Sequence, residues 1–117
     1  MYGSLVERLR ERIARGEVQP IPHATAEELG DFHAKPNECH SNVARWCREH
    51  PGHRPVIGWL ITSGAMFDKH SIVDRGGAAG LFDITPMSDR RTSDFLAHEG
   101  TRAEFDAEPN HFVAVNI

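Results

Sequence analysis

The chain has 117 residues, of which 39% are hydrophobic and 26% are charged, and its net charge is −4. This length predicts one domain over residues 1–117, and the composition is typical of a folded protein rather than a disordered one. The acidic balance gives no basis for binding to nucleic acid or to an anionic membrane. No apolar run approaches the roughly 20 residues that span a bilayer.

The first half of the chain predicts helices. Residues 4–15 carry apolar side chains at helical spacing, and Gly16 ends that segment. Residues 19–22 contain two prolines and are expected to be an extended connector. Thr25–Glu28 has the capping-box pattern of a helix start, so a short helix should follow and end near Gly30.

A third helix is expected from Asn37 or Glu38 to His50, since Pro51-Gly52 would end it. Cys39 falls in its first turn, on the face that also carries Val43, Trp46 and Cys47. Another face carries Asn42, Arg45 and Glu49. Cys39 and Cys47 would lie about 12 Å apart along the helix axis, too far for a disulfide, so both are expected to be free thiols.

The second half of the chain predicts strands. The expected strands are 56–62, 66–74, 81–85 and 112–117, with a glycine-rich hairpin loop at 75–80 and a short helix or loop at 88–98. Helices followed by a meander of strands indicate an α+β fold, in which N-terminal helices pack on a small antiparallel sheet. Trp46 and Trp59 are expected to belong to the core.

Three side chains in these elements suit a cysteine nucleophile site. The N-terminus of a helix favours the thiolate of Cys39, the imidazole of His70 can exchange a proton, and the carboxylate of Asp83 can orient that imidazole. A hairpin centred between Gly77 and Ala78 would place His70 and Asp83 as diagonal neighbours about 7–8 Å apart. A register slip of one residue would place them on opposite faces.

The order of these residues resembles the transglutaminase-like and NlpC/P60-like branches of the papain-like cysteine hydrolases. The resemblance covers roughly residues 33–87 and is carried by the segments 36–42, 58–60, 69–71 and 80–86. It implies a papain-like core in which Cys39 is the nucleophile, His70 the base and Asp83 the orienting carboxylate, with no cofactor. The chain departs from the family pattern at Ser71 and Ile72, where a small residue and then an aromatic one are usual.

An oxyanion donor is also expected, since the developing charge on the substrate oxygen needs more than one N–H group. The family resemblance implies a side chain shortly before the nucleophile, usually a glutamine. Here His33 stands six residues before Cys39 and Asn37 stands two before it. Either of them could complement the backbone N–H of Cys39.

Two other classes of function compete with this hypothesis. One is a zinc site, and its potential ligands are His33, Cys39 and His40, or Cys47, His50 and His53. Neither group has the paired spacing of a structural zinc site, and neighbouring residues on a helix point about 100° apart, so no metal is predicted. The other class is an interaction module that has lost catalysis.

The favoured interpretation is a hydrolase or acyltransferase that attacks an amide or acyl carbon. Its substrate would be a peptide, a protein or a small amide. The same three residues would serve a peptidase, an amidase, a deamidase or a transglutaminase-type transfer, so the sequence leaves these open. Met1–Glu7 has neither the basic nor the apolar stretch of a signal peptide, so a cytoplasmic location is expected.

Overall fold

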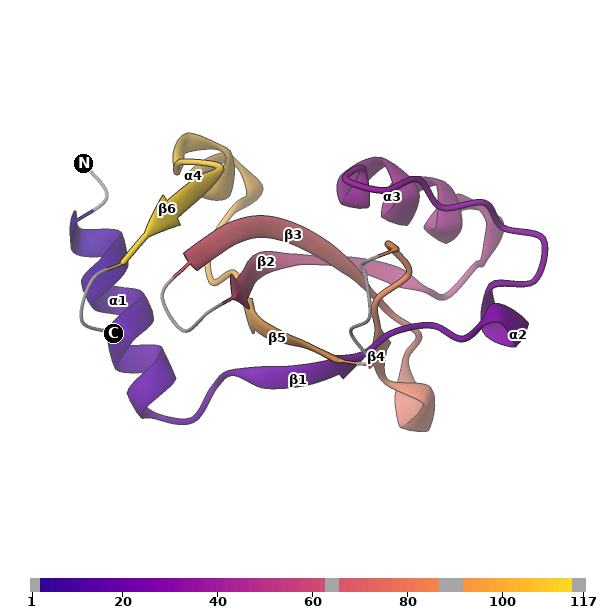
Figure 1. Ribbon diagram of the computed structural model, residues 1–117, viewed down its shortest axis with the longest axis horizontal. Coiled ribbons are helices and arrows are strands. Elements are labelled where there is room, and N and C mark those ends of the chain that lie inside the picture. The colour runs from indigo at the N-terminus through magenta and orange to yellow at the C-terminus, as the bar shows by residue number, and fades with distance from the viewer. Residues whose placement is uncertain (1–2, 63–65, 87–91, 115–117) are drawn as a thin grey trace.

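The computed structural model describes residues 3–62, 66–86 and 92–114, and they form an α+β fold (Figure 1). The helices are α1 (Gly3–Ala14), α2 (Ala26–Leu29), α3 (Cys39–Glu49) and α4 (Arg102–Ala107), with a 3-10 turn at Gly77–Ala79. The strands are β1 (Gln19–Pro22), β2 (Arg54–Thr62), β3 (Met66–Asp74), β4 (Leu81–Phe82), β5 (Thr92–Ala97) and β6 (His111–Val113). None of the described helices is long and apolar enough to cross a membrane.

The first three helices lie within two residues of their predicted bounds. In α2 the capping box forms as expected, because Thr25 Oγ1 accepts from the N–H of Glu28 at 3.1 Å and the Glu28 carboxylate accepts from the N–H of Thr25 at 2.9 Å. The extended connector at 19–22 is β1, a strand of the sheet. Local signals were sufficient for the three helices, whereas the pairing of residues 19–22 in the sheet was not predicted.

The sheet has six strands, in the order β1-β5-β2-β3-β4, and β6 pairs with β3 outside this path. The paired strands are all antiparallel, and β2 and β3 form a long hairpin over nine residue pairs. The prediction of a simple meander therefore holds for β2, β3 and β4 and is wrong for the rest. β4 is also shorter than the predicted strand 81–85, because the chain leaves β3 after Phe82.

The expectation of a helix or loop at 88–98 is wrong for Thr92–Ala97, which is β5 in the middle of the sheet. Its polar residues do not have the pattern of a buried strand, but Phe95, Leu96 and Ser93 are buried. Ser93 Oγ lies 2.7 Å from His23 Nε2. β5 pairs with β1 on one side and with β2 on the other, and its local sequence does not predict these hydrogen bonds. Residues 87–91 lie outside the described residues.

Two C-terminal elements also differ from the sequence predictions. α4 was not predicted, although Thr101 and Glu104 form a capping box that is readable in the sequence. The last strand begins one residue earlier than predicted and pairs with β3 as far as Val113. Residues 115–117 of the predicted strand lie outside the described residues.

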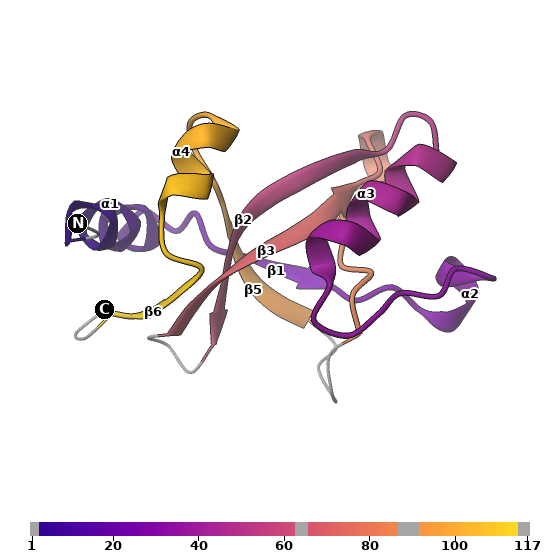
Figure 2. The same cartoon turned by 90° about the horizontal axis from the view of Figure 1, so that it is seen from above.

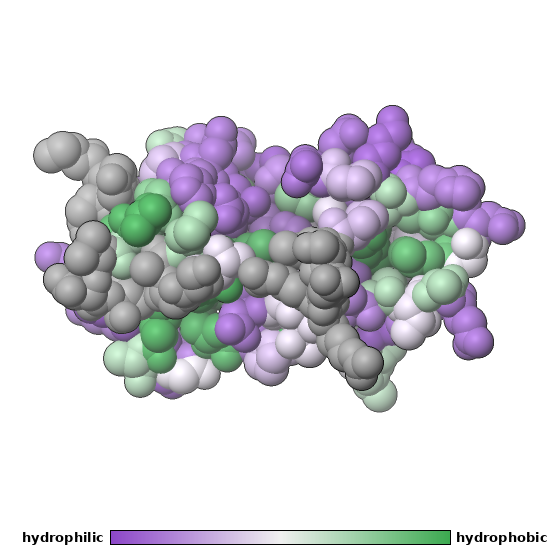
Figure 3. All heavy atoms as spheres, viewed as in Figure 1, coloured by the Kyte–Doolittle hydropathy of each residue, from purple (hydrophilic) through white to green (hydrophobic). Residues whose placement is uncertain are grey.

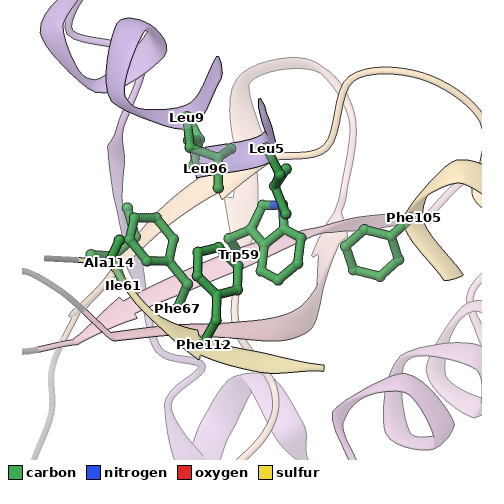
Figure 4. Close-up of a cluster of buried hydrophobic side chains, with 9 residues drawn as sticks. All are labelled: Leu5, Leu9, Trp59, Ile61, Phe67, Leu96, Phe105, Phe112 and Ala114. Atoms are coloured by element: carbon green, nitrogen blue, oxygen red, sulfur yellow. The ribbon is translucent and has the colours of Figure 1, made fainter. Parts of the chain in front are cut away.

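The buried side chains form three clusters, one of which contains Ile21, Ile72 and Phe95. The other two lie toward opposite ends of the sheet, where α1 and α4 pack at one end and α3 at the other (Figure 2). One cluster lies between α1, α4 and the sheet and is labelled in Figure 4: Leu5, Leu9, Trp59, Ile61, Phe67, Leu96, Phe105, Phe112 and Ala114. A second cluster lies beneath α3 and contains Val43, Trp46, Val73, Phe82 and Ile84. Trp46 and Trp59 are core residues, as predicted. The outer surfaces of α3 and α4 are largely hydrophilic (Figure 3).

The two outer strands of the sheet meet at one corner. Beyond β4, the N–H of Asp83 donates to the carbonyl of Pro22 at 2.9 Å, and the N–H of Ala24 donates to the carbonyl of Asp83 at 2.8 Å. His23 and Asp83 form a parallel bridge between the segments that follow β1 and β4. The backbone of Asp83 is therefore fixed by residues from the start of the chain.

Candidate active site

Cys39 is the first residue of α3. The chain enters the helix through Asn37, whose φ of 63° lies in the left-handed region that asparagine tolerates better than most residues. Glu38 is the N-cap and contributes no side-chain capping bond. The half-buried thiol thus sits at the positive end of the helix dipole, where a thiolate is favoured.

His70 and Asp83 form a buried pair. His70 Nε2 and Asp83 Oδ2 are 2.6 Å apart, and the side chains are 6% and 0% exposed. Asp83 Oδ1 accepts a hydrogen bond from the N–H of Thr85 at 3.0 Å. The pairs Val73–Phe82 and Asp74–Leu81 have the register of a hairpin centred between Gly77 and Ala78, so the predicted register is confirmed.

The thiol and the imidazole shift each other's ionisation. Burial raises the pKa of Cys39, but hydrogen bonds and charge from His40 and His70 outweigh it and lower the pKa from 9.0 to about 6. Burial lowers the pKa of His70, but the hydrogen bonds to Asp83 and Cys39 and their charges raise it from 6.5 to about 9. Near neutral pH the site therefore holds a thiolate beside an imidazolium.

The two shifts have opposite effects on how stability depends on pH. The raised pKa of His70 contributes stability that is complete below pH 6.5 and is lost as the pH rises through about 9. The lowered pKa of Cys39 contributes stability that is complete above pH 9.0 and is lost as the pH falls through about 6. Between pH 6.5 and 9 one contribution grows while the other fades, so folding takes up no net proton at this pair.

Replacing Cys39 by serine should expose the His70 contribution alone. The His70–Asp83 bond remains, so stability from His70 should fall as the pH rises above 6.5, with no thiol to compensate. We expect the free energy of unfolding of wild type, minus that of Cys39→Ser, to grow between pH 6.5 and 9. Urea titrations over this range measure it, and a constant difference would contradict the thiolate–imidazolium pair.

Asn42 connects the nucleophile helix to the segment that carries Asp83. It lies one turn after Cys39 and is buried, although the sequence pattern groups it with Arg45 and Glu49 on a polar face of the helix. Its amide bonds the backbone N–H of Lys35 at 2.9 Å and the carbonyl of Lys35 at 2.8 Å. It also donates to Thr85 Oγ1 at 3.1 Å. Asn42 thereby fixes the loop that precedes Cys39. It also fixes Thr85, whose N–H donates to Asp83.

A cleft of about 350 Å³ opens over the candidate site. Its lining residues are Asn37, Cys39, Leu60, Thr62, Asp68, Lys69, His70, Thr85 and Pro86. His33 is exposed and is not among them, whereas Asn37 is. Of the two predicted oxyanion donors, only Asn37 lines the cleft that contains Cys39. A larger cleft of about 640 Å³ lies between α1 and α4 and contains none of Cys39, His70 and Asp83.

The histidines proposed as zinc ligands have other partners. The ring of His50 stacks on Trp46 with centroids 3.7 Å apart, and His50 Nδ1 lies 2.8 Å from the Trp46 carbonyl. Trp46 Nε1 donates to His53 Nδ1 at 3.0 Å. Within the described ranges, no three or more His, Cys, Asp or Glu side chains form a group that could hold a metal ion.

Sequence reasoning missed two residues of this site. His40 was considered only as a metal ligand, yet its Nδ1 is hydrogen-bonded to Ser71, and it is one of the groups that lower the pKa of Cys39. Asn42 was assigned to the polar face of the helix. The only sequence signal for His40 was its position next to the nucleophile, and for Asn42 its position one turn later.

Comparison of the chain with protein-family models, with curated proteins and with solved structures found no match.

Proposed function

We propose that this protein is a cysteine hydrolase or acyltransferase that acts on an amide or acyl bond, with a papain-like core. Cys39 is the nucleophile, His70 the general acid and base, and Asp83 the residue that orients His70. The observation that carries the proposal is the buried 2.6 Å bond between His70 and Asp83, with His70 and Cys39 lining the same cleft. A buried histidine with a carboxylate on one side and a thiol on the other is the arrangement that activates a nucleophile.

The reaction follows from the protonation states of this pair. The thiolate of Cys39 attacks the carbonyl carbon, and the imidazolium of His70 gives its proton to the leaving nitrogen as the C–N bond breaks. The product is a thioester on Cys39 and a neutral His70. Water or an amine then attacks the thioester, His70 takes up its proton, and the C–S bond breaks to restore the thiolate and the imidazolium.

The tetrahedral intermediate carries its negative charge on the former carbonyl oxygen. The backbone N–H of Cys39 stands in the first turn of α3, where it has no acceptor within the helix. The side chain of Asn37 lines the same cleft and supplies a second donor. These two groups make up the proposed oxyanion site.

The substrate proposed for this site is a peptide, a protein or a small amide. A cleft of about 350 Å³ lies at the lower end of the range for small-molecule sites, so it suits a small amide or a short segment of a chain. Leu60, Thr62 and Pro86 give it partly apolar walls. Both cysteines are free, which supports the proposed cytoplasmic location.

Acyl transfer from p-nitrophenyl acetate tests the proposal directly. The wild-type protein should release a burst of one equivalent of p-nitrophenol, carry an acetyl group on Cys39 and then turn over. His70→Ala should lose the burst, because the thiol then lacks its counter-charge and proton acceptor. Stopped-flow absorbance and peptide mass spectrometry provide the two readouts.

His33→Ala is the matched control, since His33 is an exposed histidine outside the cleft, and it should behave as wild type. Acetylation of Cys47 in place of Cys39 would contradict the proposal. So would a burst that is the same in His70→Ala as in wild type.

A further inference from the structure

The turn that precedes the nucleophile holds both proposed oxyanion donors. The N–H of Glu38 donates to the carbonyl of Lys35 at 3.3 Å and closes a four-residue turn. Pro36 and Asn37 occupy its two central positions, and the φ of 63° at Asn37 is the positive value that a type II turn requires there. Cys39 follows as the first residue of α3. The position of this turn therefore sets where the Asn37 side chain and the N–H of Cys39 lie.

Asn42 holds the first residue of this turn by its backbone. Asn42 Oδ1 accepts from the N–H of Lys35 at 2.9 Å, and Asn42 Nδ2 donates to the carbonyl of Lys35 at 2.8 Å. These partners determine which end of the amide is oxygen and which is nitrogen, since an N–H only donates and a carbonyl only accepts. The carbonyl of Lys35 thus accepts hydrogen bonds from both Asn42 and Glu38.

The second N–H of the Asn42 amide reaches the other half of the site. Asn42 Nδ2 also donates to Thr85 Oγ1 at 3.1 Å. The N–H of Thr85 donates to Asp83 Oδ1 at 3.0 Å, and Asp83 bonds His70. Asn42 and Thr85 are both buried, so water does not compete for these bonds. One amide therefore connects the turn before Cys39 to the segment that carries the orienting carboxylate.

We propose that Asn42 is a positioning residue, whose side chain holds the oxyanion donors and Asp83 in a fixed relation to each other. This inference rests on the proposed role of Cys39 as nucleophile. Both N–H groups of the Asn42 amide are used by Lys35 and Thr85, so Asn42 acts on the substrate through these neighbours. A displacement of about 1 Å in a catalytic group can cost about 100-fold in rate, so such indirect control is effective.

Two reactions of Cys39 depend differently on the oxyanion donors. Alkylation by iodoacetamide displaces iodide from a saturated carbon, so no negative charge develops on an oxygen. Acetylation by p-nitrophenyl acetate passes through a tetrahedral intermediate, whose oxygen needs the donors. Both reactions require the thiolate. The ratio of the acetylation rate to the alkylation rate at one pH therefore reports on the oxyanion donors, because the fraction of thiolate cancels.

The test replaces Asn42 by leucine. Leucine has nearly the shape of asparagine but no hydrogen-bonding group, so Lys35 and Thr85 lose their partner. We expect the ratio of acetylation to alkylation to fall about 100-fold in Asn42→Leu, because the oxyanion donors move away from their positions. Stopped-flow absorbance measures acetylation, and peptide mass spectrometry follows alkylation of Cys39 separately from that of Cys47.

Val43→Ala is the matched control. Val43 is the next residue of α3 and is also buried, but it lies in the apolar cluster beneath the helix. Its truncation should lower the melting temperature, as Asn42→Leu should, and leave the ratio unchanged. An equal fall of the ratio in both variants would show that the packing of α3 sets the site, and would overturn the role of the Asn42 amide.

A double-mutant cycle with Asn37 tests the route of the effect. Asn37→Gly removes the side-chain donor but keeps a residue that adopts a positive φ freely. Part of what Asn42 holds in place is then missing. The fall in the ratio caused by Asn42→Leu should be about tenfold smaller in the Asn37→Gly background than in the wild type. Independent effects of the two substitutions would contradict the positioning role.

A wild-type ratio in Asn42→Leu would also overturn this inference. If Asn42→Leu fails to fold, as a thermal melt would show, Asn42→Asp decides by the same criterion, since it keeps the acceptor for Lys35 and lacks both donors. The wild-type protein separates the two proposals. If its Cys39 is acetylated and His70→Ala loses the burst, an unchanged ratio counts against Asn42 alone. If its Cys39 is not acetylated, the proposed function fails and the role of Asn42 fails with it.

Discussion

Replacing Asp83 by asparagine should make Cys39 much less reactive near neutral pH. The side chains of His70 and Asp83 are buried, so the carboxylate is the charge that stabilises the protonated imidazole. An amide carries no charge, and burial would then lower the pKa of His70 and leave its ring neutral. The thiolate of Cys39 would then lose the positive charge of His70. We expect the midpoint of the pH profile for alkylation of Cys39 by iodoacetamide to rise from about 6 toward the ordinary thiol pKa of 9.0.

The same substitution should nearly abolish turnover of p-nitrophenyl acetate. Loss of the orienting carboxylate from a nucleophile–His–Asp site costs on the order of 10⁴-fold in turnover, since the imidazole takes the wrong tautomer. Asparagine still accepts the N–H of Thr85 through its oxygen, so the local fold should persist. A near-ultraviolet circular dichroism spectrum like that of the wild type would show this.

Asp68→Asn is the control, because Asp68 lines the same cleft and is paired with a histidine, yet its side chain is 40% exposed. Its alkylation profile should match that of wild type. An Asp83→Asn protein with the wild-type midpoint would mean that Asp83 has only a structural role and would remove it from the proposed mechanism.

Gly58→Ala should destabilise the fold by about 3 kcal/mol or more, because the added methyl group has no room. Gly58 lies between β3 and β5 and pairs with His70 on one side and Ala97 on the other. A Cβ there would lie 2.3 Å from the carbonyl oxygen of Leu96 and 2.7 Å from the ring of Phe95. This steric clash could be relieved only if β2 and β5 moved apart. The entropic gain from removing a glycine, about 0.4–1 kcal/mol, cannot offset this.

Gly52→Ala is the matched control. No atom lies within 4 Å of its added Cβ, and its φ of 92° makes backbone strain the only cost, about 1–2 kcal/mol. Urea denaturation of both variants gives the comparison. A Gly58→Ala protein no less stable than Gly52→Ala would contradict the close approach of β2 and β5. Because the Phe95 ring also faces His70, Gly58→Ala should in addition slow the alkylation of Cys39.

The candidate site was predictable where its geometry is local. The residues just before Cys39 predict the start of the nucleophile helix, and they lie within a few positions of it. The His70–Asp83 pair depends on a hairpin whose turn is a short glycine-rich loop, Arg75–Gly80. A turn of fixed length sets the register of both its strands, so the sequence carries this contact.

The parts that sequence reasoning missed depend on residues far apart in the chain. Thr92–Ala97 becomes a strand only because β1 and β2 lie on either side of it. Asn42 is buried only because Lys35 and Thr85 meet it from two directions. A helical wheel assigns such a residue to solvent, since it contains no information about what a loop places over the helix.

The meeting of β1 with the segment after β4 also protects the sheet from pairing with other molecules. An outer strand with free N–H and C=O groups is a template for strand addition by a second chain, and long exposed edges lead to aggregation. Here the groups of Pro22, Ala24 and Asp83 pair with one another. Pro20 and Pro22 of β1 have no N–H to offer. The backbone contact that fixes the carboxylate of Asp83 thus also closes the corner where another strand could attach.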